Sequence, residues 1–517
     1  MESTKILVNG KRLPTPILFG LNFPAVVQIQ LTELNSNFMD GNIDKREGLT
    51  GHLVFAIAAA AFGSAFQHGY NTGVVNAPQK LVEKFINETY SERYNEVPSD
   101  SVVTLIFSLM VSIFCLGGML GALGTAYLAE NFGRKGGLLL NNAFVFVAAA
   151  LMGFGKMARS YEMLIAGRFV IGLNSGLNAG LSPMYLTEIS PVHLRGAVGT
   201  IYQLTIAFTI LVSQILGMPE ILGTESGWPV LFGLIIVPAI FMLATLPLCP
   251  ESPKYILICK GKEVAAQKAL KWFRGTGDVH YEMDEMRNES QELKMVPKVT
   301  LKEMWGNVVL RKPLIIAVVV MLSQQLSGIN AVIFYSTSIF ITAGLSNQSA
   351  IYATLGMGTV NVLMTVVSMV LVEKAGRKTL HLTGLAGMMV ITALLTLSLA
   401  LTPQAAWLSY VSVFCIIGFI ILFASGPGSI PWFLVAELFG QGARPLATSI
   451  AVSVNWLANF CVSLGFLPIV ESIGEYTFLI FTAILAMCCL FTYNRVPETK
   501  GRTVEEITAE FREKSTN

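Results

Sequence analysis

Three amide side chains and a hydroxyl lie in the middle of a long apolar stretch, where they could bind a neutral ligand rich in hydroxyl groups. The motif is Gln324-Gln325-Leu326-Ser327-Gly328-Ile329-Asn330, within an uncharged run from Pro313 to Ile341. Such a run is typical of a membrane-spanning helix, in which central polar side chains are costly unless they face partners or a water-filled cavity. Each amide can donate to and accept from a hydroxyl group. Alternatively, these groups only join neighbouring helices by hydrogen bonds.

A regular helix could not bring these amides together. At about 100° per residue, Gln324 and Gln325 point about 100° apart, and Asn330 lies more than about 100° from both. Gly328 lies between Gln325 and Asn330, and a break in the helix there would let all three side chains turn towards one ligand. Irregular backbone is tolerated within a membrane only beside protein or a cavity. We therefore expect a break between Ser327 and Asn330.

The composition indicates a polytopic membrane protein. Of 517 residues, 53% are hydrophobic and only 13% are charged, which is too apolar for a soluble protein of this size. The formal net charge of +2 gives no reason to expect nucleic acid as a partner. The seven cysteines lie mostly in apolar runs without metal-ligand spacing. Because we also find no nucleophile or phosphate-binding loop, we expect no enzyme activity, no metal and no cofactor.

Twelve apolar runs predict an all-α membrane protein with six spans on each side of a charged stretch. The runs cover roughly 52–74, 103–128, 136–156, 163–185, 198–220, 228–248, 313–340, 350–372, 379–401, 408–435, 445–468 and 475–493. Residues 75–102 are expected to form a loop. The predicted parts are a cytosolic N-terminal extension (1–50), a first six-helix bundle (51–249), a cytosolic helical linker (250–312), a second six-helix bundle (313–494) and a cytosolic tail (495–517).

The distribution of positive charge predicts that both termini are cytosolic. Most Lys and Arg residues of the loops fall on one side of this plan, and the opposite loops after spans 5, 7, 9 and 11 contain none. The loop 75–102 and the turn with Lys156 and Arg159 are exceptions. On the outer side, Asn87-Glu88-Thr89 is a candidate glycosylation site at Asn87.

Three charged motifs recur in the two halves, which indicates a duplicated unit of the kind found in transporters. Gly133-Arg134-Lys135 recurs as Gly376-Arg377-Lys378, Glu188 with Arg195 recurs as Glu437 with Arg444, and Glu251 is echoed by Glu498, at offsets of 243, 249 and 247 residues. These acids and bases lie at the cytosolic ends of the spans. They could form an inner gate, or they could be ordinary positive flanks.

Other spans also contain polar side chains. Glycine and proline around Gly426-Pro427-Gly428 predict a second broken helix, with Trp432 just after it. Trp432 could cover the apolar face of a sugar or could anchor the helix at the membrane interface. Further polar candidates, each of which could also simply join helices, are Gln203, Gln214, Asn361, Asn455, Trp456 and Asn459.

From about Gly48 to Phe511 the chain resembles the facilitative glucose transporters, which are sugar porters of the major facilitator superfamily. The resemblance rests on the motifs above and on Gly69-Tyr70-Asn71-Thr72-Gly73, Pro183, Pro250-Glu251-Ser252-Pro253, Pro431-Trp432, Val435-Ala436-Glu437-Leu438-Phe439 and Pro497-Glu498-Thr499-Lys500-Gly501-Arg502. It implies the major facilitator fold, with two pseudo-symmetric six-helix bundles. The sugar contacts that it implies are Gln203, Gln324, Gln325, Asn330, Asn361, Trp432, Asn455 and Trp456. The gate residues that we expect are Tyr335, Arg134, Glu188, Arg195, Glu251, Glu373, Arg377, Glu437, Arg444 and Glu498.

The chain departs from the glucose-preferring branch of that family at three places. Ala424 stands where the branch usually has a glutamate before Gly-Pro-Gly, which removes one sugar contact. Phe334 precedes Tyr335 where the branch has two tyrosines, which removes a hydroxyl from the outer gate. The leader of about fifty residues is longer than usual for the family.

The resemblance implies facilitated diffusion of a hexose, chiefly D-glucose, across the plasma membrane by alternating access. The alternatives are a proton-coupled sugar symporter and a sugar receptor that does not transport. Proton-driven sugar porters resemble one another in having an aspartate where this chain has Asn71, and asparagine does not titrate. His68 is a titratable group close by. The expected partners are the hexose and the lipid bilayer; the sequence indicates no nucleic acid and no obligate protein partner.

Overall fold

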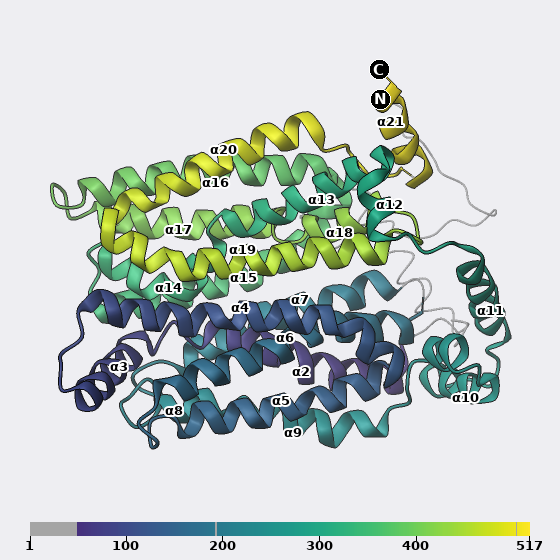
Figure 1. Ribbon diagram of the computed structural model, residues 1–517, viewed down its shortest axis with the longest axis horizontal. Coiled ribbons are helices and arrows are strands. Elements are labelled where there is room, and N and C mark those ends of the chain that lie inside the picture. Colours follow the sequence, from purple (N-terminus) through teal and green to yellow (C-terminus); the bar gives the residue numbers. More distant parts are fainter. Residues whose placement is uncertain (1–48, 192–193, 503, 517) are drawn as a thin grey trace, which may run out of the picture. The chain divides into compact units, whose positions relative to one another are not determined.

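The structure is a computed structural model that describes residues 49–191, 194–502 and 504–516. Nearly all of the expected cytosolic extension, 1–50, therefore lies outside the described residues. Every regular element within the described residues is a helix (Figure 1). This is the expected form of backbone in a membrane, since a helix satisfies its own peptide groups where no water is present.

The first half of the chain forms a bundle of long apolar helices. Its elements are α2 (Gly51–Gly73), α4 (Asp100–Asn131), α5 (Arg134–Phe154), α6 (Tyr161–Ile189), α7 (Arg195–Leu216), α8 (Trp228–Gly233), α9 (Ile236–Thr245) and the short η2 (Leu246–Leu248). Side-chain caps start two of these helices, because Thr50 and Ser160 accept from the backbone N–H groups of Leu53 and Met163. The expected sixth span is divided into α8 and α9.

The second half repeats this plan. Its elements are α13 (Val308–Leu326), α14 (Ile329–Thr342), α15 (Asn347–Ala375), α16 (Arg377–Leu401), α17 (Leu408–Ser425), α18 (Ile430–Leu438), α19 (Arg444–Ile473), η4 (Gly474–Tyr476) and α20 (Thr477–Arg495). Within the described ranges, ten segments are long and apolar enough to cross a membrane. The last of these contains both α19 and α20, and α6 is a further helix of 29 residues. Counted with α6, the spans number twelve, six in each half, which is the predicted fold class.

Short helices connect the halves and mark the two ends of the spans. The charged linker contains η3 (Tyr255–Cys259), α10 (Glu263–Arg274), α11 (His280–Met295) and α12 (Leu301–Gly306), and α21 (Val504–Thr516) follows the last span. In Figure 1 the linker helices lie at one end of the spans and α3 (Gln79–Tyr94) lies at the other. We call these the linker end and the α3 end.

The prediction of a loop over 75–102 is wrong for α3. Val82, Phe85, Ile86 and Thr89 are buried at the spacing of one helical face. Ion pairs hold the helix against the neighbouring loops: Lys84 Nζ lies 2.6 Å from a Glu225 carboxylate oxygen, and Arg159 lies 2.7 Å from Glu92. The hydrogen bond from Lys84 lowers the pKa of the Glu225 carboxyl.

The closest helix packing in the first bundle joins α4 to α6 through glycines. A Cβ on Gly117 would lie 2.2 Å from the carbonyl oxygen of Phe169, and one on Gly172 would lie 2.2 Å from that of Phe114. Small residues allow this approach, which favours dispersion contacts between helices in a membrane. The backbones themselves are therefore in contact, and a side chain cannot be added without separating them.

We expect Gly172→Ala to destabilise the fold, because the new Cβ overlaps the α4 backbone. Overpacking of this kind costs about 1–3 kcal/mol or more. The measurement is the thermal unfolding midpoint of the purified protein in detergent. Gly199→Ala is the matched control, since nothing lies within 4 Å of a Cβ at Gly199. Equal midpoints for the two variants would contradict the contact.

Candidate functional site

The predicted break in the seventh span is present. Helix α13 ends at Leu326, Gly328 adopts the left-handed conformation with φ +92°, and α14 begins at Ile329. A side chain at Gly328 would be strained in this conformation and would lie 3.1 Å from the ring of Phe481. Glycine at this position therefore permits the sharp change of direction that separates Gln325 from Asn330.

The break brings the predicted amides together, with a fourth from α19. Gln325 Nε2 donates to Asn455 Oδ1 (3.0 Å) and to Gln324 Oε1 (3.3 Å). Asn455 Nδ2 donates to Gln324 Oε1 (2.8 Å), and Asn330 Nδ2 donates to Gln325 Oε1. We call these four residues the amide network. Gln324, Gln325 and Asn455 are buried, and Asn330 is half-buried.

A second break, also predicted, supplies backbone acceptors to this network. Helix α17 ends at Ser425 and α18 begins at Ile430, so the carbonyls of Pro427 and Gly428 are free of a continuous helix. Gln324 Nε2 donates to both of them, at 3.2 Å and 2.7 Å. A Cβ at Gly426 would lie 2.4 Å from the carbonyl oxygen of Leu380 on α16. The two breaks are thus joined by one side chain.

The remaining predicted sugar contacts lie outside the network. Gln203 on α7 is exposed, Asn361 on α15 is half-buried, and Trp432 on α18 is 42% exposed. None of these side chains bonds to the amide network, and each keeps at least part of its surface exposed.

Trp456 of α19 packs into the first half of the chain. Its ring stacks on His68 with the ring centroids 5.9 Å apart and meets the edge of Phe114 at 6.1 Å. His68 Nδ1 lies 3.3 Å from the hydroxyl of Tyr202. This contact was not expected from the sequence, since His68 and Trp456 are far apart in the chain and in different halves.

A buried arginine that we did not predict as a site residue lies close to Asn71. The guanidinium of Arg168 is fully buried and donates to the carbonyl oxygen of Asn71 at 2.7 Å. It also lies over the ring of Phe114, 4.5 Å from the centroid. A charged residue within an apolar run is a signal of function in a membrane protein, and that signal was present in the sequence.

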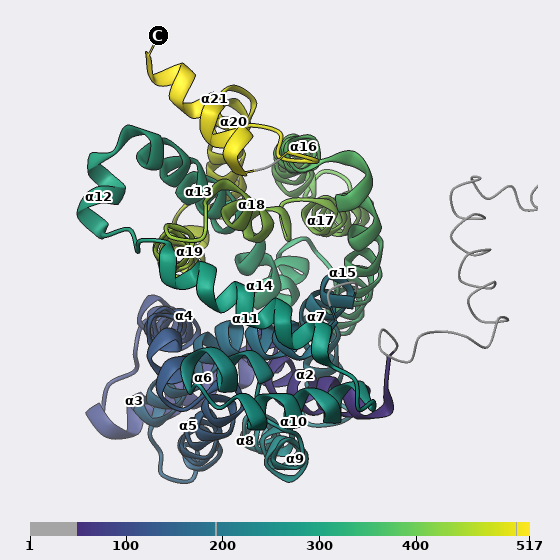
Figure 2. The same ribbon diagram turned by 90° about the vertical axis from the view of Figure 1, so that its right-hand side faces the viewer.

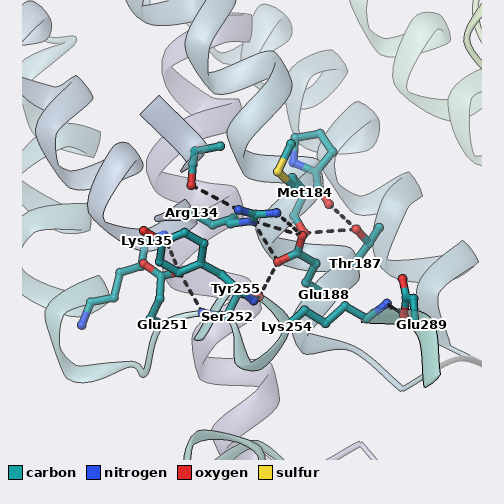
Figure 3. A network of polar contacts seen from close by, with 12 residues as sticks. Arg134, Lys135, Met184, Thr187, Glu188, Glu251, Ser252, Lys254, Tyr255 and Glu289 are labelled. Atoms are coloured by element: carbon teal, nitrogen blue, oxygen red, sulfur yellow. Dashed lines mark hydrogen bonds and ion pairs between the residues drawn. The ribbon is translucent and has the colours of Figure 1, made fainter. Parts of the chain in front are cut away.

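The charged motifs of the first half form one cluster at the linker end (Figure 3). Arg134 and Glu188 form an ion pair at 2.9 Å, and Glu251 accepts from the backbone N–H groups of Lys135 (2.9 Å) and Gly136 (3.2 Å). Ser252 donates to Glu188. Both carboxylates therefore hold the start of α5 in place.

The second half repeats these contacts. Arg377 and Glu437 pair at 3.0 Å, and Glu498 accepts from the N–H groups of Arg377 (2.8 Å) and Lys378 (3.1 Å). The side chain of Glu373 lies outside the described residues.

The two remaining gate arginines bond to backbone of their own half. Arg195 donates to the carbonyl oxygen of Ser190, and Arg444 donates to that of Phe439. For the side chains described, every ion pair of the predicted inner gate thus joins groups of the same half.

At the α3 end, by contrast, hydrogen bonds join the two halves. Asn76 Nδ2 donates to the carbonyl oxygen of Ile333 (2.9 Å) and to Ser336 Oγ (2.5 Å), and the N–H of Thr337 donates to Asn76 Oδ1 (3.3 Å). The predicted gate residue Tyr335 is buried and donates to the carbonyl oxygen of Ser463 at 3.0 Å. Its ring centroid lies 6.4 Å from that of Phe107 in the first half.

The candidate glycosylation site lies within helix α3. Asn87 is half-buried, and Thr89 of the same triplet is 5% exposed. An enzyme that needs the whole triplet would therefore have to act before α3 has folded against the bundle.

Comparisons with known proteins agree on one family. The family model "Sugar (and other) transporter" matches residues 56–511. The facilitated glucose transporter member 1 of solute carrier family 2 from Gallus gallus is 49% identical over 465 residues, which cover 90% of this chain and 94% of that protein. Member 4 from Homo sapiens is 48% identical over 470 residues, covering 90% of this chain and 92% of that protein.

Solved structures with a similar fold include a proton:xylose symporter of the major facilitator superfamily, XylE, bound to 6-bromo-6-deoxy-D-glucose. Its TM-score is 0.72 at 25% identity, with 90% of this chain and 100% of that chain covered. An inward-open conformation of the xylose transporter XylE from E. coli matches in fold with a TM-score of 0.73 at 24% identity, covering 89% of this chain and 99% of that chain.

Proposed function

Because the chain belongs to the sugar transporter family, we propose that it carries a hexose, chiefly D-glucose, across the plasma membrane by facilitated diffusion. The relatives that are about half identical to it are facilitated glucose transporters. The protein is a transporter and not an enzyme. Its residues must therefore bind the sugar on one side of the membrane and release it, chemically unchanged, on the other.

The observation that carries this proposal is the amide network at the junction of two helix breaks. Gln324, Gln325, Asn330 and Asn455 are neutral groups whose donors and acceptors are bonded mainly to one another. Sugar hydroxyls have the same donor and acceptor character, so they can replace these bonds one for one at little net cost. A charged substrate would find no counter-ion in the network.

Accessible side chains complete the proposed site. Trp432 is 42% exposed and can cover the apolar face of the ring, while Gln203 and Asn361 offer further amides from α7 and α15. Trp456 would lie at the edge of the site, since its ring packs between His68 and Phe114. The buried Ala424 next to this region has no polar group, so sugar selection would depend on the amides.

We propose that the two ends of the spans open in turn. In this structure Asn76 joins the halves at the α3 end, whereas the pairs Arg134–Glu188 and Arg377–Glu437 stay within their own halves at the linker end. The inner-gate proposal is that these charges pair across the halves when the α3 end is open. Each sugar would then be exposed to only one side at a time.

The surroundings of Asn71 support uniport over proton symport. The Asn71 side chain donates to the carbonyl oxygen of Gln67. Within the described residues, the hydrogen bonds of Arg168 go to backbone carbonyl oxygens, including that of Asn71, and not to a carboxylate that could take up a proton. His68 is held against Tyr202 and Trp456. A receptor that binds sugar without transport is the remaining alternative.

We further propose that the linker end faces the cytosol in the cell membrane, so that both termini are cytosolic. The excess of Lys and Arg at that end supports this orientation. It places α3 outside the cell, where Asn87 would be available for glycosylation before the helix folds. The partners of the protein would be the hexose and the surrounding lipid.

Uptake into liposomes tests the function. Purified protein should let labelled D-glucose reach equal concentrations inside and outside the liposomes. Inhibition of this uptake by unlabelled galactose and fructose then measures the sugar selectivity. An inward proton gradient should not change the final level, because Asn71 does not titrate. Accumulation that collapses with a protonophore would contradict uniport and point to His68. Binding of glucose without uptake would instead support the receptor.

Gln325→Ala should weaken glucose binding while the protein still folds. Gln325 bonds to three other members of the network, and losing one neutral hydrogen bond to the sugar costs about 0.5–1.5 kcal/mol, roughly three- to tenfold in affinity. Isothermal titration or competition against a labelled sugar measures the change. The control is Thr396→Val, since this buried hydroxyl donates to its own helix at Thr392. Unchanged affinity in Gln325→Ala would place the sugar elsewhere.

A further inference from the structure

The amide of Gln214 on α7 is buried without a hydrogen bond. Gln214 is 2% exposed, and neither its Nε2 nor its Oε1 has a partner. Across the described ranges, no other residue leaves both of its polar side-chain atoms in this state. A side chain whose only purpose was to join helices would be bonded to its neighbour, so this explanation does not fit Gln214.

Gln214 faces the opposite half of the protein. Its Oε1 lies 2.4 Å from where a Cβ would stand on Gly358 of α15, so the missing side chain at Gly358 makes room for the amide. Helices α7 and α15 belong to different halves and pack side by side (Figure 2). This contact surface must separate if the halves move apart at the α3 end.

The position of Gln214 connects the central site to the α3 end. Gln203 and Gln214 are eleven residues apart, which is about 20° around the helix, so both lie on one face of α7. On α15, Asn361 and Thr354 lie on the same face as Gly358, three residues after it and four before it. Thr354 bonds to Ser336 (3.3 Å) and Thr337 (2.9 Å), and both of these contact Asn76.

These residues form a polar row between the halves. The row is buried towards the α3 end, whereas two of its members are exposed or half-buried (Gln203 and Asn361). The row consists of Gln203 and Gln214 on α7, Asn361 and Thr354 on α15, and Ser336 and Thr337 on α14. All carry neutral hydrogen-bonding groups, the same kind as in the amide network. If the α3 end opens, the row becomes the wall of a cavity that leads to that network.

We propose that Gln214 is a sugar contact of the α3-open state, forming a second subsite for a neutral polyol between the α3 end and the amide network. Its unpaired donor and acceptor are satisfied there by sugar hydroxyls. In the state described here the subsite is collapsed, and the sugar contacts of the proposed site are the amide network with Trp432, Gln203 and Asn361. This inference rests on the proposed sugar transport.

The test compares the affinity of the Gln214→Leu variant for glucose with its affinity for the deoxy analogues of glucose. Inhibition constants for D-glucose and for 1-, 2-, 3-, 4- and 6-deoxy-D-glucose are measured in liposomes of known orientation, with the sugars added at the α3 side or the linker side. Glucose affinity from the α3 side should fall roughly three- to tenfold, the effect of one neutral hydrogen bond. One analogue lacks the hydroxyl that Gln214 binds, so its affinity should fall less than that of glucose. The ratio of its inhibition constant to that of glucose therefore changes.

Two further variants keep this result interpretable. Gln214→Met has nearly the same length and tests whether any loss comes from the amide and not from the shape of the side chain. Ser213→Ala is the neighbouring control, because Ser213 is buried and donates to the carbonyl oxygen of Ile210 on its own helix. The inhibition constants of Ser213→Ala for glucose and the deoxy analogues should match those of the parent protein.

The outcomes separate the inference from the function on which it rests. The subsite is supported if the ratio of inhibition constants, analogue to glucose, changes for one analogue. The change should appear in both Gln214 variants and only when the sugars are added at the α3 side. Equal losses of affinity for all sugars overturn the subsite and make Gln214 a residue that affects only the balance between states. No loss for any sugar overturns it as well. If the parent protein does not transport glucose at all, the proposed function itself fails.

Discussion

The structure depends on how backbone groups are satisfied where membrane helices break. Peptide groups without partners are costly in a membrane, yet both the seventh and the tenth spans are interrupted. Gln324 resolves the second break by donating to the freed carbonyls of Pro427 and Gly428. The same side chain accepts from Asn455 and Gln325 through its oxygen. Stability of the broken backbone and polarity of the candidate site therefore come from the same amides.

Under the proposed sugar transport, this arrangement would let the candidate site be both buried and exchangeable. The bonds within the network are neutral and similar in strength to those a sugar would make, so replacing them changes the free energy little. In the proposed transport cycle, movement would be controlled away from the candidate site, by Asn76 at the α3 end and by the charged clusters at the linker end. The clusters repeat in the two halves, as expected for a duplicated unit.

The sequence predicted the features that arise from local chemistry. Central amides beside Gly328, and glycines beside Pro427, were sufficient to predict both breaks, and the recurring motifs predicted the paired clusters. Helix α3 was missed because its buried face is short and surrounded by charge. The packing of Trp456 against His68, the acceptors of Gln324 and the unpaired amide of Gln214 could not be predicted, since each depends on how distant helices pack together.

Distances between spin labels on α4 and α19 test alternating opening most directly, because these helices belong to different halves and run the length of the spans. Labels at Leu105 and Ile469 report the α3 end, and labels at Tyr127 and Ser449 report the linker end, in a protein lacking the exposed Cys259 and Cys461. Asn76→Ala removes bonds that join the halves at the α3 end. The account predicts that this variant lengthens the distance at the α3 end and shortens it at the linker end. A linker-end distance that stays constant or also lengthens would contradict it.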